Sequence, residues 1–432
     1  MSVTVQQMQA AKRRRADLSR RVGTYAFALI APFIAMCMAL FRPRDPASKN
    51  VIWLFVIFYG SVFFIAPWST ADSASYARTL AFMHGSDYGI RDLWAQFFAE
   101  GSRYQDIYQP LLTFFVAIVT DEYWLLFAAN GILYGYVFSR NVWFLIDRSP
   151  RQFYPAIFLL ILGFAFIMDV GSGLNGFRMW TALQVFLFGL FYFLDSQKKR
   201  YLIVISLTPL IHFSFWLPLG VFGLFFLVRR YPIPVFVFFI LSFFLAYIDL
   251  ALVRRLIGLV PLPLEERVGS YLFGAEQVLQ GTRTRGSSVW FLALNRQLLD
   301  IFSVLAVSWL MWRNGIKASP LIRGLLVYGM LLYGAINLMD YIPAMGRFRN
   351  LVHMVIIAAS VLFLSKLDIA RPLDRQLFVF KALLLSINTA LGIRFSAGFA
   401  SVWLLAGNIF VAPFVTATVP LYDAVMSFLI GR

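Results

Sequence analysis

The residues best suited to chemistry lie in two neighbouring apolar segments between positions 169 and 218. Asn175 and Arg178 lie at the head of the first segment, three residues apart and therefore on one face of the helix that we expect there. His212, followed closely by Ser214, interrupts the second segment. Ionisable side chains are costly at membrane depth and usually mark a pathway, a partner or a site. We therefore expect the function of the chain to depend on these residues.

Arg178 is the strongest candidate for binding an anion. Its guanidinium is charged at every relevant pH, and its fork of N–H donors matches phosphate oxygens. The preceding Gly171-Ser172-Gly173 can expose backbone N–H groups, which also favours an anion site. The structural alternative is that Arg178 extends to the interface while Asn175 caps its helix.

His212 can serve near neutral pH as a general base or as a hydrogen-bond donor. A buried histidine that only satisfies local hydrogen bonds fits the same pattern. Asp72 and Tyr76 lie on one helical stripe together with Ser75 and Thr79. Asp72 is a second candidate base, although an acidic residue after an apolar run is commonly a helix N-cap.

A later segment, residues 340–347, adds Tyr341 and Arg347 as candidates for binding substrate. Arg347 can also be an interfacial arginine without a ligand. Farther from these, Arg296 and Asp300 are four residues apart within an apolar run, which predicts a structural ion pair. Arg349 and His353 share a face of the next expected helix.

The composition predicts an all-α, polytopic integral membrane protein. The chain has 432 residues, of which 60% are hydrophobic and 14% are charged, and its mean hydropathy is +0.74. A soluble domain carries about 25% charged residues. The net charge of +17 comes mainly from short basic clusters between apolar runs, a pattern typical of topology signals and not of nucleic-acid binding. One cysteine and three dispersed histidines predict no disulfide, no metal site and no cofactor.

We divide the chain into a basic tail, residues 1–22, and a single polytopic domain, residues 23–432, with about 11–13 membrane segments. Two amphipathic loops are expected at the outer face, near 69–108 and 249–287. The run 109–120 is too short to span comfortably. The basic clusters at 198–200 and 229–230 enclose only a helical hairpin, residues 201–228, with His212 near its apex. Further spans are expected at 23–41, 51–68, 123–146, 153–169, 174–194, 233–248, 288–312, 320–338, 347–365, 377–392 and 398–421.

The basic clusters leave one conflict at the N-terminus. If both long loops are outside and 23–41 and 51–68 are both full spans, the basic tail is also outside, against the positive-inside rule. Either 23–41, interrupted by Pro32, is not a simple span, or the tail breaks the rule.

Three motifs together resemble the EpsG-like, Wzy-type bacterial polysaccharide polymerases. Thr70-Ala-Asp72-Ser-Ala-Ser-Tyr76 resembles an Asp-x-x-x-Tyr motif of that family. Asn175-Gly-Phe-Arg178-Met-Trp-Thr-Ala182 is similar to its Asn-x-x-Arg-Gln-x-x-Ala helix start, and it is followed by a basic turn and by Ile211-His212-Phe-Ser214. Gly346-Arg347-Phe348 resembles a late Arg-Phe step. The order and spacing match over roughly residues 70–350, while Met179 replaces the usual Gln and Pro67-Trp68 lies where an Arg is frequent.

The resemblance implies a GT-C-like membrane enzyme at the periplasmic face of the bacterial inner membrane. Such an enzyme transfers a glycan from undecaprenyl diphosphate to another lipid-linked repeat unit, giving exopolysaccharide, capsule or O-antigen. It implies Asp72, Arg178 and His212 as catalytic residues, and Tyr76, Asn175, Ser214, Tyr341 and Arg347 as substrate-binding residues. Membrane lipid surrounds it, and a chain-length regulator and a flippase are the implied partners.

Two alternatives remain open. A GT-C glycosyltransferase that uses a polyprenyl-phosphate sugar often has paired acidic residues in its first outer loop, and Asp72 has no acidic neighbour in the sequence. A transporter or flippase of the lipid-linked unit typically has repeated halves with broken helices at matching positions. The chain has no such internal repeat.

Overall fold

A computed structural model describes residue 7 and residues 18–66, 69–98, 106–150, 155–244, 290–339, 343–366, 372–415 and 417–430. The expected second outer loop, 249–287, and Tyr341 lie outside these residues, as does most of the basic tail. The described part is helical, and its only β-type pairings are two isolated bridges, Phe63 to Ala400 and Ser401 to Pro420.

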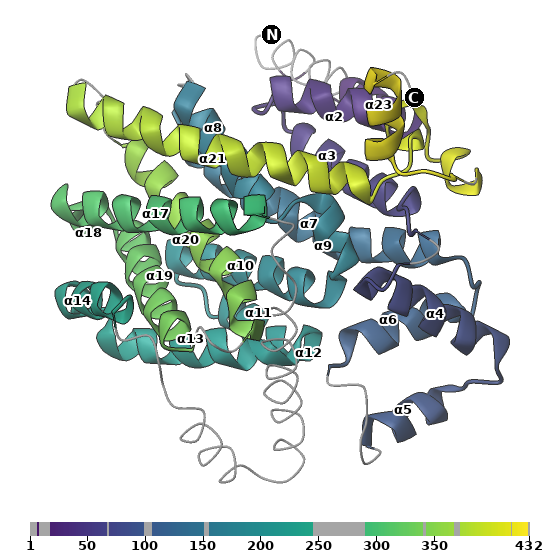
Figure 1. Ribbon diagram of the computed structural model, residues 1–432, viewed down its shortest axis with the longest axis horizontal. Coiled ribbons are helices and arrows are strands. Elements are labelled where there is room, and N and C mark those ends of the chain that lie inside the picture. The colour runs from purple at the N-terminus through teal and green to yellow at the C-terminus, as the bar shows by residue number, and fades with distance from the viewer. Residues whose placement is uncertain are drawn as a thin grey trace.

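The helices pack in one bundle at several different angles, and the long helix α21 runs across its upper part (Figure 1). Their bounds are α2 Pro32–Phe41, α3 Ser48–Ser61, α4 Asp72–Gly85, α5 Ile90–Phe98, α6 Tyr108–Ala117, α7 Tyr123–Arg148, α8 Pro155–Ile167, α9 Val170–Asn175, α10 Phe177–Ser196, α11 Arg200–Ser206, α12 Thr208–Ile211, η1 Phe213–Phe215, α13 Trp216–Val228, α14 Pro232–Ser242, α17 Trp290–Trp312, α18 Gly315–Ala318, α19 Pro320–Leu338, η2 Pro343–Arg347, α20 Phe348–Leu364, α21 Pro372–Gly398, α22 Trp403–Ala406, η3 Ala412–Phe414 and α23 Leu421–Ile430.

Four helical stretches of the described residues are long and apolar enough to cross a membrane. They are Ile157–Asn175, Phe177–Ser196, Pro320–Leu338 and Met345–Leu364. Several shorter apolar helices pack around them. The prediction of an all-α protein embedded in a membrane is therefore supported. The expected outer loop 69–108 forms the two short helices α4 and α5, and the short run after it forms the ten-residue helix α6.

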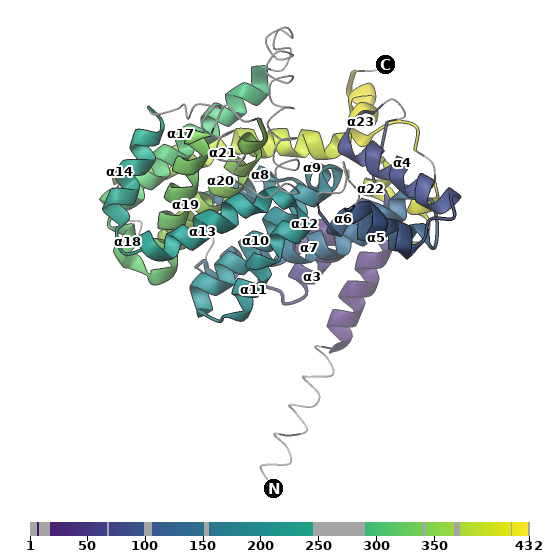
Figure 2. The same cartoon turned by 90° about the horizontal axis from the view of Figure 1, so that it is seen from below.

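The turns that carry most Lys and Arg side chains lie together at one end of the bundle. Arg44 donates hydrogen bonds to the backbone oxygens of Ser149 and Pro150, both at 2.7 Å, which joins the α2–α3 turn to the end of α7. Arg148 pairs with Asp195 at the end of α10, just before the cluster 198–200. Figure 2 shows the α10–α11 turn and α18 on the lower side, with α4 and α9 above. We name the lower side the basic end.

The N-terminal segment resolves the conflict over the tail. Residues 18–30 are helical, the chain bends at Ala31, and α2 then returns beside them, because Arg20 pairs with Asp45 at 3.0 Å. Pro32 favours this bend because it cannot donate to the preceding turn. The region 23–41 is therefore a helical hairpin and not a simple span. Both ends of the hairpin lie at the basic end, in agreement with the positive-inside rule.

The expected span 398–421 is wrong. The chain there forms only the short elements α22 and η3, separated by irregular backbone, before α23 begins. Gly407, Pro413 and Pro420 interrupt helical hydrogen bonding at intervals too short for a spanning helix. The segment pairs instead with the end of α3, where the backbone N–H of Phe64 donates to the oxygen of Phe399 at 2.9 Å.

The short helix α9 is packed through glycine against two tyrosines. A Cβ on Gly171 would lie 2.5 Å from the Tyr59 hydroxyl and 2.8 Å from the Cα of Ser396, and a Cβ on Gly173 would lie 2.2 Å from the Tyr134 hydroxyl. Both glycines are buried. Close approach of α3, α7 and α21 to α9 therefore requires glycine here. This contact holds the residues that follow α9 at a fixed depth in the bundle.

Replacing Gly171 by Ala is expected to lower the free energy of unfolding by about 1–3 kcal/mol, because the added methyl group overfills this contact. Thermal unfolding of the purified protein in detergent measures the effect. Gly220→Ala in α13 is the matched control, because a Cβ there meets no atom within 4 Å. Equal stability of the two variants would contradict the packing role of Gly171.

Candidate functional site

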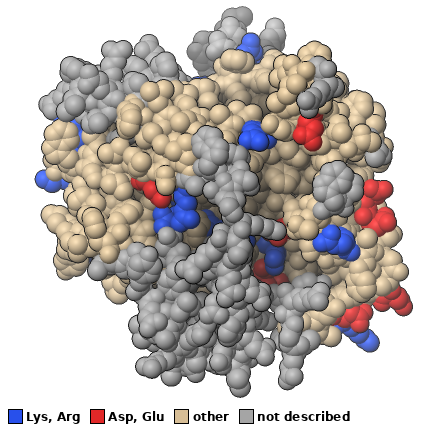
Figure 3. Space-filling model, in the orientation of Figure 1, with Lys and Arg blue, Asp and Glu red and all other residues tan. Residues whose placement is uncertain are grey.

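Side chains from four separate elements, most of them predicted site residues, converge at the end of the bundle opposite the basic end. The head of α10, the first turns of α4, the segment before α6 and the α12–η1 turn contribute side chains. The backbone N–H of Ile107 donates to the oxygen of Leu210 at 3.0 Å, which joins the segment before α6 directly to the α12–η1 turn. Figure 3 looks onto this face, where basic and acidic side chains lie close together near the centre. We refer to this set of residues as the candidate site.

Arg178 is its central residue. Its Nε donates to the Tyr76 hydroxyl at 3.3 Å, and its Nη1 lies 3.3 Å from a carboxylate oxygen of Asp106. The Arg178 side chain is 29% exposed, whereas that of Asp106 is 1% exposed. The carboxylate thus holds the guanidinium from below and leaves part of it accessible to a ligand. Burial raises the pKa of Tyr76 to about 12, so its hydroxyl is a neutral hydrogen-bonding group.

Asn175 and Asp72 meet at the break between α9 and α10. The Asn175 side chain accepts a hydrogen bond from the backbone N–H of Ser73 at 3.4 Å. A Cβ on Gly176 would lie 3.7 Å from a carboxylate oxygen of Asp72, which places that carboxylate beside the break. Asp72 is exposed, so a ligand can reach it. Its location beside Tyr76 and Arg178 agrees with the prediction that these residues form one site.

Three local expectations are wrong. Gly171-Ser172-Gly173 forms no exposed anion nest, because both glycines are buried inside α9. Asn175 does not cap α10, whose N-cap is Gly176, and the break there means that Asn175 and Arg178 lie on two helices, not on one continuous face. Asp72 is not an N-cap, since α4 begins at Asp72 itself; its carboxylate is located where the helix dipole favours negative charge.

His212 lies at the turn of the predicted hairpin, as expected. Its Nδ1 accepts from the backbone N–H of Ser214 at 3.3 Å and lies 2.6 Å from the Ser214 hydroxyl. This network assigns the proton of the neutral ring to Nε2, so the free edge of His212 is a donor. The Ser214 hydroxyl also lies 3.9 Å from the sulfur of Met179. The hairpin apex is thereby fixed against the head of α10.

Arg347 completes the candidate site from the end of η2. It is exposed, and its charge, like that of Arg178, acts on His212. The ring of the next residue, Phe348, packs against Phe215 of η1 with the centroids 5.4 Å apart, so Arg347 lies in the same region of the bundle as the His212 turn. Tyr341, the other residue expected in this segment, lies outside the described residues.

Asp106 is the important residue that the sequence did not single out. It lies in the expected amphipathic loop among many charged residues, and its spacing matches no motif. Burial raises its pKa to about 6, against the opposing effect of the Arg178 charge. Its second carboxylate oxygen is buried and has no hydrogen-bond partner among the described residues. Only a prediction of burial for this one residue in the loop would have identified it.

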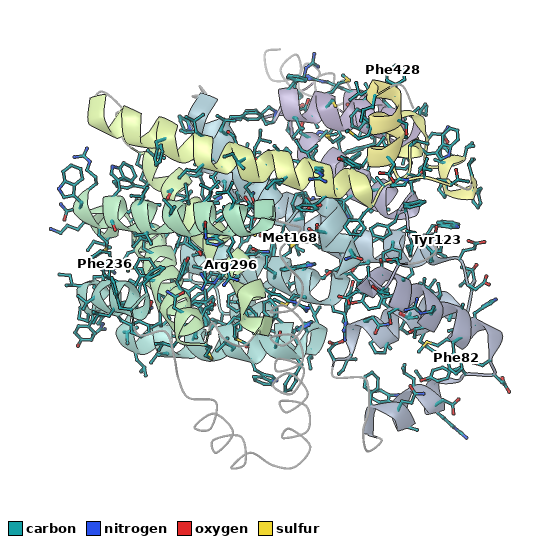
Figure 4. All side chains as sticks on the ribbon, in the orientation of Figure 1. Phe82, Tyr123, Met168, Phe236, Arg296 and Phe428 are labelled. Atoms are coloured by element: carbon teal, nitrogen blue, oxygen red, sulfur yellow. The ribbon has the colours of Figure 1, made fainter. Side chains whose placement is uncertain are left out.

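A second polar cluster lies where α17, α19 and α20 meet. Asp300 on α17 accepts from Arg349 at 3.0 Å and from the Tyr333 hydroxyl, and its carboxylate lies 3.5 Å from Nε2 of His353. Asp300 and Arg349 line a cavity of about 590 Å³ together with Asn337. Figure 4 shows Arg296 in the region where α17 crosses α20. Asp300 therefore contacts two residues of α20, which the sequence prediction of an ion pair within α17 did not include.

The arrangement provides the groups needed to bind a phosphate or a hydroxyl-rich ligand. Arg178 and Arg347 supply positive charge, Asp72 supplies an exposed carboxylate, and His212 supplies a neutral donor. Within the described residues, no three His, Cys, Asp or Glu side chains cluster as metal ligands would. Comparison of the chain with protein-family models, with curated proteins and with solved structures found no match in any of the three.

Replacing Asp106 by Asn is expected to remove a pH dependence of stability. Burial raises the pKa of the folded carboxyl from 3.8 to about 6, so the folded protein holds this proton more tightly than the unfolded chain does. The cost of burying the charge is therefore absent well below about pH 4 and fully present above about pH 6. As the pH rises between these limits, the free energy of unfolding of the variant should therefore increase relative to that of the wild type by up to about 3 kcal/mol.

Unfolding in detergent, measured from about pH 4 to about pH 7, tests this expectation. Asp87→Asn is the control, because Asp87 is an exposed carboxylate of the same outer region. A constant difference between wild type and the Asp106 variant across this range would contradict the burial of the charge.

Proposed function

We propose that this protein is a membrane glycosyltransferase that polymerises glycan repeat units carried on undecaprenyl diphosphate. The proposal places it in a bacterial inner membrane, with a GT-C-like bundle of about 11–13 membrane segments and the candidate site at the periplasmic face. The observation that carries it is the convergence of Arg178, Arg347 and His212 with the exposed Asp72 at the end opposite the basic turns. The sequence motifs that resemble the Wzy-type polymerases lie in these same elements.

In the proposed reaction, a hydroxyl oxygen of the acceptor glycan attacks the anomeric carbon of the donor glycan. A new glycosidic bond forms, and the bond from the anomeric carbon to the lipid diphosphate breaks. Negative charge develops on the departing diphosphate, where Arg178 and Arg347 stabilise it. The acceptor proton passes to a carboxylate, and the freed undecaprenyl diphosphate leaves into the membrane.

Asp72 is the proposed base. It is exposed and lies beside the α9–α10 break, whereas the Nδ1 of His212 is already occupied by Ser214. His212 therefore acts as a donor through Nε2, toward a phosphate or sugar oxygen. Asp106 is a positioning residue, because its contact is with Arg178 and it is buried beneath it.

Arg178→Ala and Arg178→Lys test the role of the guanidinium. Loss of a group that stabilises transition-state charge lowers the rate by about 10²–10³-fold, so Arg178→Ala should leave only single repeat units on the lipid. Arg178→Lys should recover part of the activity, because it restores charge but not the two-pronged geometry. Glycan length from cells or from purified protein with lipid-linked repeat units gives the readout.

The control is Arg323→Gln, which removes an exposed arginine from the start of α19 near the basic end. It should leave glycan length unchanged. Full-length polymer from Arg178→Ala, at a protein level equal to the wild type, would refute the proposal.

Asp72→Asn separates base catalysis from substrate binding. The variant keeps the size and polarity of the side chain and loses the proton acceptor, so kcat should fall by about 10²-fold or more with a small change in KM. The rate of polymerisation by purified protein at several concentrations of lipid-linked unit measures both constants. A large rise in KM with unchanged kcat would show instead that Asp72 binds substrate.

One structural observation favours a second candidate function, a glycosyltransferase that uses a polyprenyl-phosphate sugar. Asp72 and Asp106, which are distant in the sequence, both act electrostatically on Tyr76. Two carboxylates thus meet in the first outer region, as is frequent in glycosyltransferases that use a polyprenyl-phosphate sugar. Incubation of the purified protein with each donor class distinguishes the two: transfer from a lipid monophosphate sugar, and not from a lipid diphosphate repeat unit, would support this alternative.

A further inference from the structure

A second cavity lies at the basic end, inside the N-terminal hairpin. Its volume is about 360 Å³, and it is enclosed by residues 18–30, by α2 and by the turn that leads into α3. Arg20 and Arg42 line it together with Thr24 and Ser48. It is remote from the candidate site, because Arg20 pairs with Asp45 in the α2–α3 turn, which itself contacts the far end of α7.

The cavity has a charged part and an apolar part. Residues 20–49 carry five basic side chains and only one acidic one. Arg20 uses that carboxylate, Asp45, whereas Arg42 has no carboxylate within ion-pair distance among the described residues. Phe27, Ala35 and Met38 form the apolar wall. A ligand that fits has an anionic head and a hydrocarbon chain.

The exposed side chains of the N-terminal hairpin indicate that the hairpin contacts membrane lipid. Ile30 is 63% exposed, Ile34 53% and Phe41 88%, so both arms present large apolar side chains away from the bundle. An apolar helical surface beside basic residues is typical of segments that contact the hydrocarbon and head-group regions of a membrane. The cavity therefore opens where phospholipid is the most abundant amphiphile.

We propose that this cavity binds one anionic phospholipid. Its phosphate lies against Arg42 and Arg20, and one acyl chain lies along Phe27 and Met38. Basic clusters at the cytoplasmic side of membrane helices attract anionic lipids in this way. The lipid would add to the contacts that already join the two arms, which include the Arg20–Asp45 pair and the hydrogen bond from Asn50 to Tyr25. The proposal is independent of the catalytic function.

The chain offers matched variants for the test. Arg42→Gln removes a charge that lines the cavity. Arg21→Gln removes the charge of a residue that is next to Arg20 in the sequence but does not line the cavity. A Cβ on Gly23 meets no atom within 4 Å, and Gly23 lines the cavity, so the larger side chain of Gly23→Trp should obstruct the cavity. Gly220→Trp places the same side chain in a similarly open position on α13.

Native mass spectrometry of delipidated protein in an uncharged detergent, titrated with phosphatidylglycerol or phosphatidylcholine, measures the binding. We expect one saturable phosphatidylglycerol and weaker phosphatidylcholine binding. Arg42→Gln should weaken the phosphatidylglycerol affinity by about fivefold, and Arg21→Gln by less than about twofold. Gly23→Trp should abolish the bound lipid while Gly220→Trp retains it, with thermal unfolding confirming that both are folded.

Three results would overturn the proposal. Equal binding of the two lipids would show that the charge is unimportant. An equal loss of phosphatidylglycerol affinity in Arg21→Gln and Arg42→Gln would show that the lipid is attracted by the general positive charge of the surface and not by the cavity. Displacement of the lipid by millimolar inorganic phosphate alone would show a site for a free anion.

Discussion

The ion pair between Arg178 and Asp106 is the interaction on which the candidate site depends. A guanidinium at the head of a membrane helix needs a partner, because burying an unpaired charge is costly. Asp106 supplies that partner from a segment 72 residues earlier, and Tyr76 supplies a second contact. The first outer region is thereby joined to α10, so the ion pair positions Asp72 as well as Arg178.

The depth of the Arg178–Asp106 pair in the bundle depends on the packing of uncharged residues around α9. Gly171 and Gly173 let α9 approach Tyr59 and Tyr134 closely, and the break at Gly176 then turns the chain into α10. A larger residue at either glycine would push α9 outward and move Arg178 with it. The glycines that suggested an anion nest thus serve the site indirectly, through its scaffold.

The two ends of the bundle have different kinds of charge. At the candidate site, Arg178 and Arg347 are accompanied by Asp72 and Asp106, so opposite charges lie near one another. At the basic end, arginines outnumber carboxylates and adjoin exposed apolar side chains, an arrangement suited to a membrane surface.

The sequence alone determined the helical membrane class, the hairpin with His212 at its turn, and the position of Arg178 at the head of a helix, because hydropathy and charge clusters are local properties of the chain. It left open whether residues 23–41 span the membrane, and the prediction for 398–421 was wrong because hydropathy does not register glycine and proline breaks. Only the tertiary structure identified Asp106. Its role comes from burial under Arg178, and burial depends on which distant segments pack together.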